Sequence, residues 1–187
     1  MGKPMFGALL FGLLVIPPVR HLMESVMIVH MLVQIPLLIL AGFLMAGFFR
    51  KSFQRFWFVW NENGVPGMLL VVIIVLYWLI PRTIDASLEN WSMEWFKFIS
   101  LPFLAGIPLG DSWGKIGTLT KSIIMFNLIP MLGLMAWLYI DAPVRVCNNY
   151  LEAEQKMLGW GFLMITAGCI IYMLQYAFTD RSDAVSE

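Results

Sequence analysis

The sequence predicts an all-α fold, a polytopic membrane bundle of six transmembrane helices, or five if the first apolar segment does not cross. Residues 25–49 carry no charged side chain, and a helix of that length crosses a hydrocarbon core about 30 Å thick. Hydrophobic residues make up 60% of the chain and charged residues 13%, with mean hydropathy +0.79. Soluble domains are roughly 45–50% apolar and 25% charged. We therefore expect a single integral membrane domain over residues 1–187.

The first predicted span covers about residues 4–19, which are short for a crossing and end at Pro17-Pro18. A cleaved signal peptide is the alternative, but no small-x-small cleavage site precedes Arg20. The second span is 25–49.

Turn residues at Asn61–Gly64 precede the third predicted span, 65–81. The fourth, 91–109, is the poorest because it contains Glu94 and Lys97. Three positions apart on a helix, these two side chains can pair near its end. The remaining predicted spans, 122–140 and 157–178, contain no charge.

Lysine and arginine in short loops predict the orientation, because they concentrate on the cytoplasmic side. With six spans, both termini are expected in the cytoplasm of a bacterium, and the protein in its inner membrane. The more basic side carries Lys3, Arg50, Lys51, Arg55, Lys115, Lys121 and Arg181, and the other carries Arg20, Arg82, Arg145 and Lys156, with Lys97 if it lies near the interface, and the acidic Asp85, Glu89 and Glu94.

Aromatic residues gather near the ends of the predicted spans. Trp57, Trp60, Trp91, Trp95 and Trp160 are typical of an interfacial belt. The segment 53–60 offers more aromatic area than a belt requires, which predicts a contact with other membrane subunits; interfacial anchoring is the alternative.

Several function classes find no support. The formal net charge is zero, so a nucleic-acid partner is not expected. Cys147 and Cys169 are too far apart for a CxxC redox or zinc pair. No GxSxG, P-loop or HExxH motif is present, so we predict no catalytic residues and no enzyme activity.

The best candidate for a ligand site is a stripe of soft side chains. Met23, Met27, His30 and Gln34 follow at intervals of four, three and four, which places them on one helical face. Thioether and imidazole groups suit Cu(I), so the stripe predicts a copper site at His30, Met27 and Met23. Packing is the alternative interpretation, because methionine fills apolar cores readily.

Other polar residues have simpler interpretations. His21 is nine residues from His30 and thus on the opposite helix face. His21 and Glu24 are expected to form an interfacial hydrogen bond rather than a proton relay. The charged residues between the last two spans form either a solvated loop or an ordered cap; they are Asp141, Arg145, Glu152, Glu154 and Lys156.

The chain resembles the bacterial membrane proteins that assemble caa-type cytochrome c oxidase. That family carries a helix similar to HMxxHMLL followed by proline and leucines, matched here by His30–Gly42. A Trp-x-x-Pro and a D-x-x-L element resemble Trp78–Pro81 and Asp85–Leu88. A late D-Q-x-x-x-G run resembles Glu154–Gly159.

The sequence also departs from the family. Its paired histidines are reduced to one, with Val26 or Gln34 at the partner position, and one of seven helices is missing. The resemblance implies an accessory or assembly protein for a copper-dependent respiratory oxidase, with Cu(I) as the candidate cofactor. A structural subunit of a membrane redox complex without its own metal is the alternative. A transporter is less expected, because four of the spans lack charge.

Overall fold

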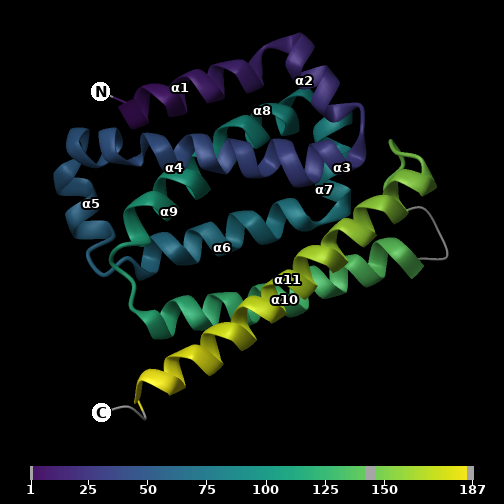
Figure 1. The fold of residues 1–187 in the computed structure, drawn as a ribbon. Helices are drawn as coiled ribbons and strands as arrows, with labels where there is room; N and C mark the ends of the chain where they lie inside the picture. Colours follow the sequence, from purple (N-terminus) through teal and green to yellow (C-terminus); the bar gives the residue numbers. More distant parts are fainter. Residues whose placement is uncertain (1, 142–145, 185–187) are drawn as a thin grey trace.

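The computed structural model describes residues 2–141 and 146–184, with side chains described up to residue 175. Within these ranges the chain forms helices and no strand, which confirms the all-α class (Figure 1). Two segments, η1 and η2, are π-helical. In chain order the elements are α1 (Gly2–Val15), α2 (Pro17–Glu24), α3 (Met27–Val29), η1 (His30–Gln34), α4 (Ile35–Ser52), α5 (Gln54–Trp60), α6 (Val65–Leu79), α7 (Pro81–Glu89), α8 (Trp91–Ile99), η2 (Ser100–Gly106), α9 (Ile107–Ser112), α10 (Thr118–Asp141) and α11 (Glu152–Ala184).

Three helical stretches are long and apolar enough to cross a membrane: Met27–Ser52, Thr118–Asp141 and Glu152–Gln175. Two bent pairs, α1 with α2 and α5 with α6, raise the number to five if each pair is one span. The predicted span 91–109 lies in helix that runs without a break from α8 to α9. Because it contains Glu94 and Lys97, it is not among these candidates.

Prolines determine where the first pair bends. The angle between α1 and α2 is 72°, and the bend lies at Ile16, whose ψ of 126° is extended. A residue before proline is driven out of the helical region by the proline ring, so Pro17 ends α1.

The second bend, of 87°, lies between α5 and α6. Gly64 has a φ of +74°, which favours glycine because it lacks a Cβ. The turn predicted at Asn61–Gly64 is confirmed.

The π-helical segments lie beside prolines. Pro36 follows η1 at the start of α4, and Pro102 lies inside η2. Proline cannot donate a backbone hydrogen bond and its ring crowds the carbonyl four residues earlier. Widened helical turns at these points accommodate that lost bond.

α4 crosses η2 at very close range. A Cβ on Gly42 would collide with the Pro102 carbonyl oxygen, and one on Gly106 would collide with the Ile39 carbonyl oxygen. Small residues commonly allow this approach between membrane helices, where packing replaces the hydrophobic effect.

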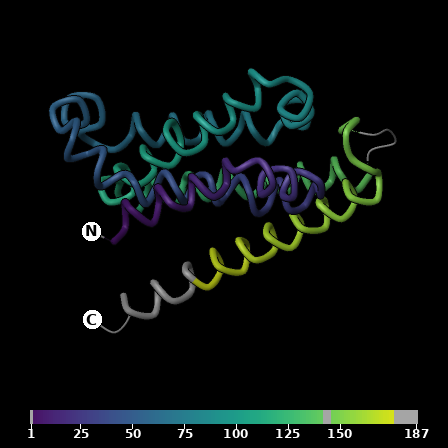
Figure 2. Tube along the Cα trace, turned by 90° about the horizontal axis from the view of Figure 1, so that it is seen from above, coloured from purple at the N-terminus to yellow at the C-terminus, as the bar shows by residue number. Residues whose placement is uncertain are grey.

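α1 lies beside α4, and α10 packs along α11 (Figures 1 and 2). α11 runs back toward the side of the molecule where α1 begins. The largest core contains side chains of most helices, among them Leu14, Met27, Leu38, Trp78, Leu101 and Leu158.

The predicted aromatic belt is partly wrong. Trp91, Trp95 and Trp160 are exposed, but Trp57 is only 8% exposed and Trp60 is half-buried. Trp57 packs against Ala46 and Ile107, so tertiary contacts withdraw it from the surface.

Candidate functional site

His30 begins η1 and is completely buried. Both of its ring nitrogens have partners. Nδ1 lies 2.8 Å from the Tyr150 hydroxyl, and Nε2 lies 3.2 Å from the Lys97 Nζ. The structure thus brings together residues that are far apart in sequence.

Lys97, from α8, is the most deeply buried cation among the described ion pairs, with a fully buried side chain. Its Nζ donates to Glu24 Oε1 at 2.6 Å, and the Glu24 side chain is 9% exposed. The Tyr150 hydroxyl donates to the Glu24 backbone carbonyl at 2.8 Å. We call Glu24, His30, Lys97 and Tyr150 the buried network.

These partners fix the protonation of the imidazole. The Tyr150 hydroxyl donates its hydrogen to the Glu24 carbonyl, so its oxygen accepts a hydrogen bond from His30 Nδ1–H. An ammonium only donates, so His30 Nε2 accepts from Lys97. His30 is therefore assigned as the neutral tautomer with its proton on Nδ1.

His30, the central predicted copper ligand, already has hydrogen-bond partners at both ring nitrogens. Met27 is fully buried and Met23 is half-buried. The lone pair of His30 Nε2, however, accepts a hydrogen bond from Lys97, whose charge opposes a cation. No group of three His, Cys, Asp or Glu side chains that could hold a metal occurs among the described residues. Copper binding stays a prediction.

Gln34 is the least satisfied polar side chain of this region. It ends η1, is fully buried, and neither its amide nitrogen nor its amide oxygen has a hydrogen-bond partner. Buried amides normally have partners, and π-helical turns often occur at functional sites.

Two predicted ion and hydrogen-bond pairs are wrong. His21 is exposed and lies 3.3 Å from Arg20, not beside Glu24. Glu94 pairs with Arg20 at 2.7 Å, and Lys97 pairs with Glu24 rather than Glu94. The pairs between neighbours in sequence do not form, because Arg20–Glu94 and Glu24–Lys97 instead join α2 to α8.

An ordered cap covers the network, as one alternative for this loop anticipated. Asp85 Oδ2 accepts from the Asn148 backbone at 2.7 Å, and Gln155 Nε2 donates to the Cys147 carbonyl at 2.8 Å. We call residues 146–151 the cap. It holds Tyr150 in place against His30.

Most of the charged residues beside the cap lie on the surface, but the half-buried Glu154 accepts from the Leu151 backbone at 3.2 Å. Lys156 and Glu152 form an exposed pair at 2.7 Å, and Asp141 is exposed. Arg145 lies outside the described residues.

Burial shifts the acid–base properties of the cap. It raises the pKa of the Cys147 thiol to about 12, with the charge of Asp85 adding to the effect. Burial also raises the pKa of the Tyr150 hydroxyl, reinforced by Glu24. Both groups are therefore protonated at neutral pH, consistent with the Tyr150 hydroxyl donating to the Glu24 carbonyl.

Some of the residues quoted for the family resemblance contact the cap. The Pro81 carbonyl accepts from Cys147 Sγ at 3.8 Å, and Asp85 and Gln155 bind the cap backbone. Trp78 Nε1 instead donates to Ser100 Oγ of η2 at 2.9 Å, and a Cβ on Gly159 would lie 3.1 Å from an α10 carbonyl oxygen.

Lys97 and Tyr150 were not predicted as site residues. For Lys97 a signal existed, because a charge in an apolar segment marks a functional position by default. Tyr150 gave no local signal, since its role depends on a contact with η1.

A second cluster of polar side chains lies between the α5–α6 turn and α9, away from the buried network. Asn61 Nδ2 donates to Asp111 Oδ2 at 2.7 Å and to Ser112 Oγ at 2.9 Å, and the Gly67 amide donates to Asn61 Oδ1 at 2.8 Å. Lys115 Nζ lies 2.6 Å from Asp111 Oδ2. These bonds join the α5–α6 turn to the end of α9.

Comparison of the chain with protein-family models, curated proteins and solved structures finds no match.

Proposed function

We propose that this chain is a non-catalytic accessory or assembly protein for a copper-dependent respiratory oxidase or a related bacterial membrane enzyme. The observation that carries the proposal is the convergence of the resembling segments. Pro81, Asp85 and Gln155 are spread over the sequence, yet all three contact the cap, whose Tyr150 lies against His30. Catalysis is not expected, so a haem, a flavin or substrate turnover in the isolated protein would contradict the proposal.

The proposed topology has six spans in the bacterial inner membrane, with both termini in the cytoplasm. The bent pairs and the three long helices supply five crossings. The unbroken helix from Trp91 to Ser112 supplies the sixth. Its charged residues are paired, Glu94 and Lys97 with α2 and Asp111 with Lys115, which lowers the cost of placing them near a membrane.

The hydrogen bonds around His30 favour a subunit without its own metal. Nε2 accepts from Lys97, and Nδ1 is used by Tyr150, so neither nitrogen is available without rearrangement. Cu(I) handling is the second candidate, because Met27 is buried in the same region and the buried Gln34 amide is unpartnered.

Copper quantification on the native protein separates these two versions. A copper-handling protein would contain copper that falls in His30→Ala and Met27→Ala, while the exposed His21→Ala serves as the matched control. If the parent protein contains no copper, Cu(I) handling is ruled out and His30 is a hydrogen-bonded packing residue.

The hetero-oligomer is tested by mild-detergent extraction and native gels. The exposed face of segment 53–60 is formed by Phe53, Phe56, Phe58 and Val59, and a partner is expected there. Phe53→Glu with Phe58→Glu should release the chain from larger complexes. Leu119→Glu, at a still more exposed apolar site at the start of α10, should not. A monodisperse monomer from native membranes would contradict the proposal.

A further inference from the structure

Two hollows open on either side of the end of α4, away from the buried network. The larger has a volume of about 580 Å³ and lies between the first turn of α1, the second half of α4 and α9. The smaller, of about 270 Å³, lies between α4, α5 and Lys115. Arg50 and Lys51 line both hollows.

The larger hollow is chemically two-sided. Phe43 and Phe48 give it an apolar wall, and Lys3, Arg50 and Lys51 supply cations at its rim. None of these three cations forms an ion pair within the part of the chain that the structure describes. Three uncompensated positive charges beside an apolar wall fit an amphiphile with an anionic headgroup.

The first turn of α1 lines the larger hollow at Lys3 and contains no acidic residue. No carboxylate of this turn therefore neutralises the cations at the rim.

Asp111 is the one carboxylate that lines the hollow, and its charge is compensated by Lys115. The residue is only 3% exposed, and its Oδ1 is buried. Asp111 therefore neutralises little of the positive charge at the rim.

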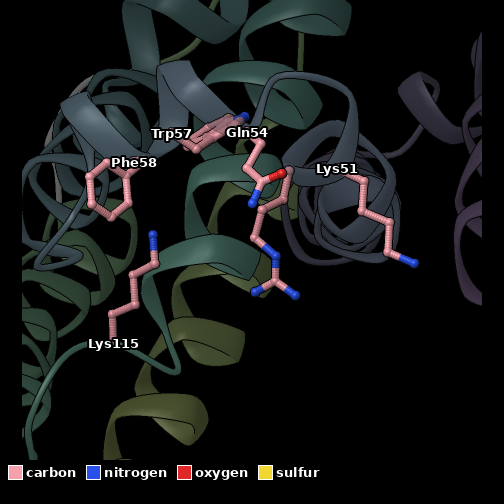
Figure 3. Close-up of a pocket in the computed structure, with 6 residues that line it drawn as sticks. Lys51, Gln54, Trp57, Phe58 and Lys115 are labelled. Atoms are coloured by element: carbon pink, nitrogen blue, oxygen red, sulfur yellow. The ribbon is translucent and has the colours of Figure 1, made fainter.

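The smaller hollow continues the same surface. Figure 3 shows the Lys115 side chain reaching toward Gln54 and Phe58, while the Lys51 side chain extends away from them. Lys115 is engaged with Asp111 and the Asn61 carbonyl. The free cations therefore belong mainly to the α4 end, where the two hollows meet.

We propose that the hollow between α1, α4 and α9 binds an anionic phospholipid. Arg50, Lys51 and Lys3 hold the phosphate, and an acyl chain lies along Phe43 and Phe48. The volume falls within the range of small-molecule sites. This inference is independent of the proposed accessory function, because it needs only that the chain lies in a membrane.

Native mass spectrometry of the full chain in maltoside micelles tests the site. The probes are phosphatidylglycerol and phosphatidylcholine with identical acyl chains. Parent protein should retain phosphatidylglycerol and lose phosphatidylcholine. The double variant Arg50→Gln/Lys51→Gln should bind phosphatidylglycerol roughly 30-fold more weakly, from the usual contribution of a lysine or arginine near an anionic surface.

Arg55→Gln/Lys121→Gln is the matched control. It removes the same charge, and neither residue lines either hollow. Binding in the control should stay within about threefold of the parent, since long-range attraction is weak once screened by salt. Thermal unfolding checks that both variants fold, and the single variant Arg50→Gln replaces the double one if it does not.

Three results would overturn the site. Equal retention of the two lipids would remove the charge selectivity. An equal loss in the control would reduce binding to general electrostatics. Displacement of phosphatidylglycerol by millimolar inorganic phosphate would indicate a free-anion site instead of a lipid site.

Discussion

The buried ion pair between Lys97 and Glu24 makes a quantitative prediction. Lys97→Met removes a side chain with no exposure and leaves the Glu24 carboxylate, 9% exposed, without its cation. Removing one partner of a buried pair typically costs about 3–5 kcal/mol, because the remaining charge is uncompensated. His30 Nε2 loses its donor as well.

Replacing both partners distinguishes charge pairing from simple loss of packing. In Glu24→Gln/Lys97→Met no buried charge is left unpaired, so the loss should fall to about 1–3 kcal/mol, the cost of the unsatisfied His30 nitrogen. Lys156→Met is the matched control. Its pair with Glu152 has nearly the same length, 2.7 Å, but the side chains are 51% and 61% exposed, so removal should cost at most about 1 kcal/mol.

Reversible unfolding in mixed detergent micelles, followed by tryptophan fluorescence and circular dichroism, measures these free energies. The double variant should be more stable than Lys97→Met alone. If its loss instead equals or exceeds that of Lys97→Met, Glu24 is not held by Lys97. If Lys97→Met and Lys156→Met lose equal stability, burial of the pair has no energetic consequence.

Two further predictions follow from packing and burial. Gly42→Ala should lower the free energy of unfolding by about 1–3 kcal/mol, the usual range for overpacking, because its Cβ would meet backbone atoms of Pro102. Gly47→Ala is the control. A Cβ at Gly47 meets nothing within 4 Å, so this variant should be neutral or stabilising in the same assay. Cys147, fully buried with its pKa raised to about 12 by burial and by a nearby carboxylate, should resist iodoacetamide at pH 8 in a chain lacking Cys169. Asn148→Cys, at the exposed neighbouring position, should react readily by mass spectrometry; equal rates would show that the cap is open in solution.

The sequence predicted the helices well, because apolar length and proline position are local properties. The charge-free run at 25–49 became most of the helix Met27–Ser52, and the two runs after residue 120 became α10 and α11. The end of α1 followed from Pro17-Pro18. The number of crossings did not follow, because it depends on the angles within the bent pairs.

The predicted ion-pair partner of Lys97 was wrong, because a residue distant in sequence lies closer in space. On a helix Lys97 and Glu94 are neighbours, so the sequence favoured their pairing. In the structure Glu24, 73 positions away, takes Lys97. The predicted exposure of Trp57 was wrong for the same reason, because no local sequence pattern shows that Ala46 and Ile107 pack against it.

Two residues quoted for the family resemblance have a structural role in this chain. Asp85 and Gln155 hold the cap, the cap holds Tyr150, and Tyr150 orients the His30 ring. These contacts give Asp85 and Gln155 a role in placing Tyr150 beside His30.

The resemblance implies a second histidine at Val26 or Gln34, and the structure gives these two positions different surroundings. Of the two candidate positions, Val26 is 37% exposed, whereas Gln34 is fully buried at the other end of η1 from His30. A partner histidine at Gln34 would lie in the interior, one helical turn from His30. The amide that occupies this position lacks the soft donor that Cu(I) prefers, and Lys97 donates to His30. Both features disfavour a Cu(I) site, so we propose a network that holds helices together rather than one that holds copper.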